Sequence, residues 1–256
     1  MTDFSSPHRA LVDSVPLPEG ADVVERTVAY EHDGVSLEAV VVTDANVSGP
    51  RPTVVIVHDW TGLREYPVAR AHMLARLGYT AVAIDIYGVG VRFADDDMEG
   101  ASAEAGRYYG DTQLLRGRVR AGFDLAASLP EVDAGRIVVA GYCFGGSVTL
   151  ELARIGAPAR GFASFHGILT AHEPADVALI AAPLLVLTGG SDPIVPDEAV
   201  AAFQDELRTN DDIDWQVSVY SGAPHAFTLP GPNYREAADR RSWSVFVDFL
   251  AETLGG

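Results

Sequence analysis

An apolar run that ends in a glycine-flanked cysteine dominates this sequence. Residues 136–146 read RIVVAGYCFGG, and the segment that follows has helical apolar spacing. This is the nucleophile-elbow pattern, with cysteine in place of the usual serine. Glycines two residues before and after Cys143 prevent Cβ clashes across a sharp strand-to-helix turn. The pattern predicts a nucleophile at a helix N-terminus, where the positive end of the dipole favours a thiolate and then an oxyanion.

Cys143 is the only cysteine in the chain. A lone cysteine is most often a small buried apolar side chain without chemistry. The two flanking glycines and the preceding apolar run favour the nucleophile over that alternative. A single cysteine also excludes an intramolecular disulfide, so a reducing cytoplasm is the expected compartment.

The charge balance is strongly acidic. The 256 residues carry a formal net charge of −18, and all 18 basic residues are arginine. Such a surface is expected to repel nucleic acid and anionic membranes. The first residues resemble no signal peptide, and no apolar stretch is long enough to span a bilayer. A monomer or small homo-oligomer without a membrane or nucleic-acid partner is expected.

Strands alternate with helices after an initial hairpin. Residues 1–20 are polar and contain proline, which predicts a loosely ordered arm, and residues 21–256 are expected to form a single domain. This order predicts an α/β fold with a mostly parallel central sheet and helices on both faces. The connection between the strands at 161–165 and 183–188 is too short for a large cap. The segment 89–110 has no clear period and is expected to be a loop or an irregular helical stretch.

A cysteine nucleophile needs a base and an orienting acid. His225 follows the last predicted strand, so it can reach the elbow across the carboxyl edge of a parallel sheet. Asp192 follows the preceding strand and gives the chain order nucleophile, acid, histidine of α/β-hydrolases. Its competitors are Asp197 and the pair Asp211–Asp212, and Asp192 could instead only cap the next turn.

Two backbone amides are expected to form an oxyanion hole. One is the amide of Phe144, directly after the nucleophile. The other is that of Trp60, in the loop after the strand at 53–57. Six histidines are expected to be structural or solvated: His8, His32, His58, His72, His166 and His172.

Five motifs together resemble the dienelactone hydrolase family. They are Gly-Tyr-Cys-Phe-Gly-Gly, the His-Asp-Trp-Thr-Gly loop at 58–62, Asp-Ile-Tyr-Gly at 85–88, Gly-Gly-Ser-Asp-Pro at 189–193 and Pro-His-Ala-Phe at 224–227. The resemblance covers roughly residues 22–254. It implies an α/β-hydrolase fold, no metal or organic cofactor, and a Cys-Asp-His triad that opens esters or lactones. The triad falls on Cys143, Asp192 and His225, and the oxyanion donors on Trp60 and Phe144.

The sequence departs from the prototype enzymes of that family at two positions. They carry a glutamate that bonds the resting thiol, where this chain has the shorter Asp59, which is expected to hold or steer that thiol. They also carry a substrate-binding arginine four residues after the catalytic histidine, where this chain has Leu229. Arg92 or Arg107 is expected to substitute for that arginine. Tyr87 and Tyr108, in the same segment after residue 85, are expected to line an aromatic substrate pocket.

The predicted activity is hydrolysis of a small ester or lactone through a thioester on Cys143. A general carboxylesterase or thioesterase would use the same residues. The alternative to an enzyme is a non-catalytic ligand-binding protein with a hydrolase fold, because fold alone does not decide activity.

Overall fold

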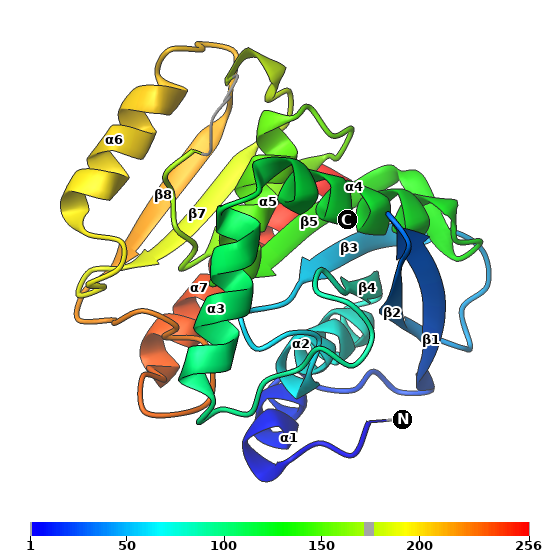
Figure 1. Cartoon of the computed structure of the whole chain (residues 1–256). Helices are drawn as coiled ribbons and strands as arrows, with labels where there is room; N and C mark the ends of the chain where they lie inside the picture. Colours follow the sequence, from blue (N-terminus) through cyan, green and yellow to red (C-terminus); the bar gives the residue numbers. More distant parts are fainter. Residues whose placement is uncertain (1, 172–176, 256) are drawn as a thin grey trace. The chain divides into compact units, whose positions relative to one another are not determined.

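The computed structural model describes residues 2–171 and 177–255. The chain divides into two compact units, Met1–Ile137 and Val138–Gly256, which are described separately below (Figure 1). The expectation of a single domain over residues 21–256 stays a prediction. His172 lies outside the described residues.

The first unit pairs a hairpin with two parallel strands. Its strand order is β1-β2-β4-β3, and only β3 and β4 are parallel. Asp33 and Gly34 both have positive φ (51° and 70°), as a tight two-residue hairpin turn requires. The expected hairpin is therefore confirmed. The elements are α1 (Ser6–Asp13), β1 (Val23–His32), β2 (Val35–Asp44), β3 (Arg51–Val57), α2 (Glu65–Arg76), β4 (Thr80–Ile84), α3 (Met98–Tyr109) and α4 (Thr112–Ser128).

The second unit contains four parallel strands in the order β5-β6-β7-β8. Figure 1 shows β7 and β8 side by side, with α6 as their connection. Because all four strands run the same way, the loops that leave their carboxyl ends share one edge of the sheet. The elements are β5 (Val132–Tyr142, which starts in the preceding unit), α5 (Phe144–Arg154), β6 (Gly161–Phe165), the 3-10 turn η1 (Val177–Leu179), β7 (Leu184–Gly189), α6 (Asp197–Leu207), β8 (Trp215–Tyr220) and α7 (Glu236–Leu254).

The N-terminal segment differs from the expected loose arm. It forms α1, which packs against α2 and buries Leu11 and Val12. The Arg76 guanidinium donates to the carbonyls of Val12 and Val15, each at 2.8 Å. The local sequence could not show this, because an eight-residue helix is stable only against a partner.

The segment 89–110 also holds more regular structure than its sequence indicates. Helix α3 starts after Asp97, whose carboxylate accepts a hydrogen bond from the Gly100 amide at 3.0 Å. Its buried residues are Ala101, Ala105 and Tyr108, at helical spacing. Because two of these three residues are alanines, the sequence shows the helical spacing of apolar residues only weakly.

Candidate active site

The turn between β5 and α5 holds Cys143 in a strained conformation. Its φ is 55° and its ψ is −114°, a region that residues other than glycine rarely occupy. A Cβ on Gly141 would lie 2.0 Å from the carbonyl oxygen of Gly145, so the chain turns too tightly for any side chain there. Cys143 is thereby held at the N-cap of α5 with its side chain partly exposed.

The elbow also packs tightly against the end of β6. A Cβ on Gly146 would lie 2.7 Å from Ser164 Oγ, and one on Gly167 would lie 2.7 Å from the Ser147 amide nitrogen. The elbow pattern accounts only for the glycines two residues from Cys143. Gly146 and Gly167 are equally necessary to bring α5 this close to the sheet.

His225 lies beside the cysteine. Its Nε2 is 3.1 Å from Cys143 Sγ, and its side chain is 13% exposed. Cys143 follows β5 and His225 follows β8, so the carboxyl ends of parallel strands bring them together from 82 residues apart. The thiol and the imidazole are within direct proton-transfer distance.

Asp192 contacts the other ring nitrogen of that imidazole. The His225 Nδ1–H donates to Asp192 Oδ2 at 2.8 Å, while Oδ1 accepts from the amides of Ile194 and Val195. The Asp192 side chain is fully buried. The competing carboxylates, Asp197, Asp211 and Asp212, are exposed on the surface.

Electrostatics favour a protonated imidazole. Burial by itself lowers the pKa of His225, but the hydrogen bonds to Asp192 and Cys143 and the charge of the cysteine outweigh it and raise that pKa to about 10. A positively charged His225 ring at 3.1 Å would stabilise negative charge on the sulfur of Cys143.

A second histidine, His166, contacts the elbow from the end of β6. It is completely buried, and its Nδ1 accepts from the Cys143 amide at 3.1 Å. Its Nε2 lies 2.7 Å from Thr228 Oγ1. From the sequence, His166 is expected to be structural or solvated, without a contact to the elbow. Its place directly after a strand that neighbours the elbow strand was the available signal.

Trp60 and Asp59 lie in the loop after β3. His58, the first residue of that loop, is fully buried; its Nδ1 donates to the Asp59 carbonyl at 2.6 Å and its Nε2 accepts from the Ile86 amide at 3.1 Å. Burial lowers the pKa of His58 and keeps it neutral. Asp59 Oδ1 accepts from the amide and the hydroxyl of Thr61, and Trp60 is half-buried. These contacts hold the loop in a defined shape.

The residues expected to line a pocket are mostly engaged in contacts with other residues of the first unit. The Arg92 guanidinium bonds to Glu38 and Asp85 and to the carbonyls of Leu63, Gly88 and Val91. Tyr87 is buried, and Tyr108 is buried with its hydroxyl on the Ile86 carbonyl at 2.8 Å. Arg107 is half-exposed and pairs with Glu104 at 2.9 Å. Their contact with a substrate stays a prediction.

Three other histidines lie at acidic partners. His72 Nε2 lies 2.9 Å from Glu25, His8 Nδ1 lies 2.9 Å from Glu65, and His32 Nδ1 lies 3.6 Å from Asp33. Over residues 2–171 and 177–255, no three His, Cys, Asp or Glu side chains cluster as metal ligands would. In the same ranges, no helix combines the length and the apolar character needed to cross a bilayer.

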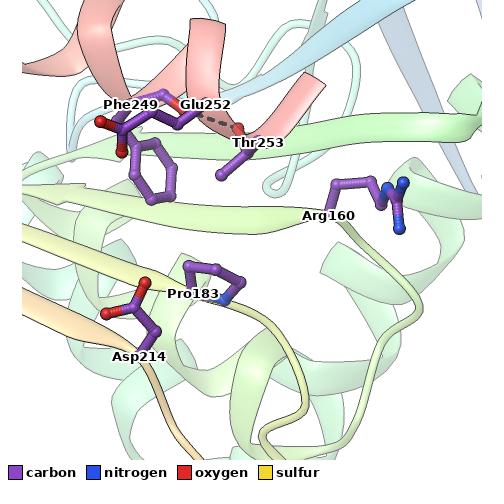
Figure 2. A pocket seen from close by; sticks show the side chains of 6 residues that line it. All are labelled: Arg160, Pro183, Asp214, Phe249, Glu252 and Thr253. Carbon is purple, nitrogen blue, oxygen red and sulfur yellow. Dashed lines mark hydrogen bonds between the residues drawn. The ribbon is translucent and has the colours of Figure 1, made fainter. Parts of the chain in front are cut away.

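A cavity of about 350 Å³ lies away from this chemistry (Figure 2). Its lining includes Arg160, Pro183 and Asp214, which directly precede β6, β7 and β8. It therefore lies at the amino edge of the parallel strands, whereas Cys143, Asp192 and His225 follow their carboxyl ends. We do not assign the substrate to it.

Comparison with known proteins agrees with the motifs. The sequence profile of the dienelactone hydrolase family matches residues 37–254. A provisionally named carboxymethylenebutenolidase of Escherichia coli K12 is 29% identical over 224 residues, which are 81% of this chain and 79% of the relative. A Bradyrhizobium protein provisionally named as a 2-oxo-3-(5-oxofuran-2-ylidene)propanoate lactonase is 27% identical over 224 residues. The aligned region covers 82% of this chain and 87% of that protein.

A solved structure extends the similarity to three dimensions. A dienelactone hydrolase-like promiscuous phosphotriesterase from metagenomic libraries superposes with a TM-score of 0.87 at 36% identity, over 92% of this chain and 100% of the other. The expected α/β-hydrolase fold, with a mostly parallel sheet between helices on both faces, is thereby confirmed. The chain belongs to the dienelactone hydrolase family and is a hydrolase of carboxylic esters or lactones.

Proposed function

We propose that the chain hydrolyses a small ester or lactone through a thioester on Cys143, with His225 as proton carrier and Asp192 as its orienting acid. The observation that supports this most is the continuous hydrogen-bonded series from Sγ to Nε2 at 3.1 Å and from Nδ1 to Asp192 Oδ2 at 2.8 Å. Covalent acyl transfer requires a nucleophile, a base and an acid that orients the base at hydrogen-bond distances such as these.

The reaction runs in two halves. The Cys143 thiolate attacks the carbonyl carbon, and the imidazolium of His225 gives its proton to the departing alkoxide, which leaves an acyl thioester. Neutral His225 then takes a proton from water as the water oxygen attacks the thioester. Collapse of the second tetrahedral intermediate releases the acid and returns the thiolate–imidazolium pair. Asp192 keeps Nδ1 protonated in both halves.

The oxyanion of each intermediate is assigned to the amide of Phe144, and the amide of Trp60 as its second donor stays a prediction. Phe144 is the first residue of α5, so its amide lies at the positive end of the helix dipole. Trp60 lies in the loop after β3, whose shape the bonds of His58 and Asp59 maintain. The role of Asp59 on the resting thiol stays a prediction.

Substrate choice follows from what stands near the histidine. Leu229, in the turn after His225, offers an apolar side chain where an arginine would hold a substrate carboxylate. We propose neutral esters or lactones as substrates in preference to carboxylate-bearing dienelactones. A thiol that must stay reduced fits a cytoplasmic enzyme, as a monomer or small homo-oligomer without nucleic acid as a partner.

Acyl trapping tests the proposal. Wild-type protein is mixed with p-nitrophenyl acetate, quenched in acid within seconds and digested. The mass of the peptide that carries Cys143 is then measured by mass spectrometry. We expect a burst of p-nitrophenol and an acetyl group on Cys143. Pre-alkylation with iodoacetamide is the control that should remove both. Ligand-dependent thermal stabilisation without turnover of any ester would contradict hydrolysis and favour a binding protein.

A phosphotriester is a second candidate substrate. The observation in its favour is the 36% identity to a promiscuous phosphotriesterase over nearly the whole chain. A thiolate can attack phosphorus as it attacks a carbonyl, with loss of an aryloxide. A panel of a neutral p-nitrophenyl ester, a neutral lactone, a carboxylate-bearing lactone and an aryl phosphotriester would rank these classes by kcat/KM.

The imidazolium of His225 should also make stability depend on pH. Its pKa in the folded state, about 10, exceeds the ordinary 6.5, so the proton binds the folded state more tightly. This contribution is complete below the ordinary pKa and is lost as the pH rises through 10. Wild type should therefore lose more free energy of unfolding than His225→Gln in urea titrations between about pH 8.5, where a cysteine of the unfolded chain loses its proton, and pH 10. Parallel pH profiles for the two proteins would contradict the raised pKa.

A further inference from the structure

One buried imidazole joins the two segments that carry the reacting groups. His166 accepts a hydrogen bond from the Cys143 amide at Nδ1, at 3.1 Å, in addition to the ladder bond from that amide to the Phe165 carbonyl. Its Nε2 lies 2.7 Å from Thr228 Oγ1, three residues beyond His225. Every atom of this bridge belongs to the second unit.

The hydrogen bonds define the protonation of the bridge. A backbone N–H can only donate, so Nδ1 of His166 must be unprotonated and Nε2 must carry the hydrogen. Nε2–H then donates to Thr228 Oγ1. His166 is thus a neutral tautomer that accepts a hydrogen bond from the Cys143 amide and donates one to Thr228, in the turn that follows His225. These bonds account for both ring nitrogens without a role as a second base.

The ring also fills the space between the two segments. It packs edge-on against His225, with centroids 5.7 Å apart, and against Phe227 at 5.3 Å. His166 is completely buried and has a φ of 41°, a strained value for a residue with a side chain. Strain of this kind persists only where the surroundings hold the residue in place.

We propose that His166 is a positioning residue that, through Thr228, sets the distance between Cys143 Sγ and His225 Nε2. The proposal rests on the proposed function, because it assigns catalysis to that pair. The bridge touches neither reacting atom. It fixes the backbone of the nucleophile at one end and the turn of the base at the other, so its loss should impair proton transfer and spare substrate binding.

Thr228→Val tests the bridge with the least disturbance, since it removes the hydroxyl and keeps the shape. We expect kcat for p-nitrophenyl acetate to fall about tenfold with KM within about twofold, and the rate of Cys143 alkylation by iodoacetamide to fall in parallel. Thr228→Ser restores the hydroxyl and should recover most of both rates.

Thr188→Val is the matched control. Thr188 lies on β7, is equally buried, and its hydroxyl has no hydrogen-bond partner among the described residues. It should leave both rates unchanged. His166→Asn is a second probe: Asn tolerates positive φ and can accept from the Cys143 amide, but it is too short to reach Thr228. It should lower both rates at least as far as Thr228→Val, because it also removes the ring that packs against His225 and Phe227.

The outcomes separate the two proposals. Unchanged kcat and alkylation in Thr228→Val would overturn the positioning role, as would equal losses in Thr188→Val. Alkylation requires no substrate, so its fall in Thr228→Val would support the bridge even if no ester were turned over and the proposed function had failed.

Discussion

Replacing Cys143 with alanine is expected to abolish ester turnover, with a loss of at least about 10⁴-fold in kcat/KM. The physical reason is that alanine has no atom that can attack the carbonyl, while His225 and Asp192 remain in place without a nucleophile to serve. Initial rates with p-nitrophenyl acetate and with a neutral lactone would measure the loss.

Cys143→Ser is the matched comparison for this result. Serine keeps a nucleophile of similar size, but its hydroxyl is far harder to deprotonate than a thiol, so it should keep a small fraction of the activity. Both variants should unfold at temperatures close to that of wild type, because Cys143 is only partly buried. Turnover by the alanine variant at the wild-type rate would remove Cys143 from the mechanism.

Gly141→Ala is expected to cause the largest loss of stability among the single substitutions considered. The new methyl group would lie 2.0 Å from the Gly145 carbonyl oxygen and 2.6 Å from Thr149 Oγ1, and a backbone carbonyl cannot move without opening the elbow. We expect a loss of about 3 kcal/mol in the free energy of unfolding, or a Tm lower by about 10 °C. Calorimetry together with urea titration would measure it.

Gly106→Ala is the control for the added methyl group. Gly106 lies within α3, and a Cβ there would meet no atom within 4 Å. This variant should be more stable than wild type by about 0.5 kcal/mol, because alanine restricts the unfolded chain. If Gly141→Ala were as stable as Gly106→Ala, the tight turn described for the elbow would be incorrect.

Most of the chemistry could be predicted from local patterns. The glycines around Cys143 indicated a turn that needs small residues, and the clash distance at Gly141 agrees with that reasoning. Asp192 and His225 each follow a predicted strand, and the carboxyl ends of parallel strands lie at one edge of a sheet. In the structure Cys143 and Asp192 contact the two ring nitrogens of His225, and their catalytic roles remain a prediction.

Other features depend on partners that are distant in the sequence. Helix α1 depends on Arg76, more than 60 positions away, which bonds to the carbonyls of Val12 and Val15. The bridge through His166 depends on Thr228, 62 positions away. A histidine after a strand looks the same in a sequence whether it contacts a nucleophile or water.

The order of residues along this chain was enough to determine its family, its parallel strands and the identity of its candidate nucleophile. These features depend on steric contacts between neighbouring residues and on the spacing of apolar residues, and both can be read from the sequence. The tertiary structure alone decided which carboxylate reaches His225, which histidine supports the elbow, and that α1 is packed. Those results depend on hydrogen bonds and contacts between residues distant in sequence, and such distances exist only once the chain has folded.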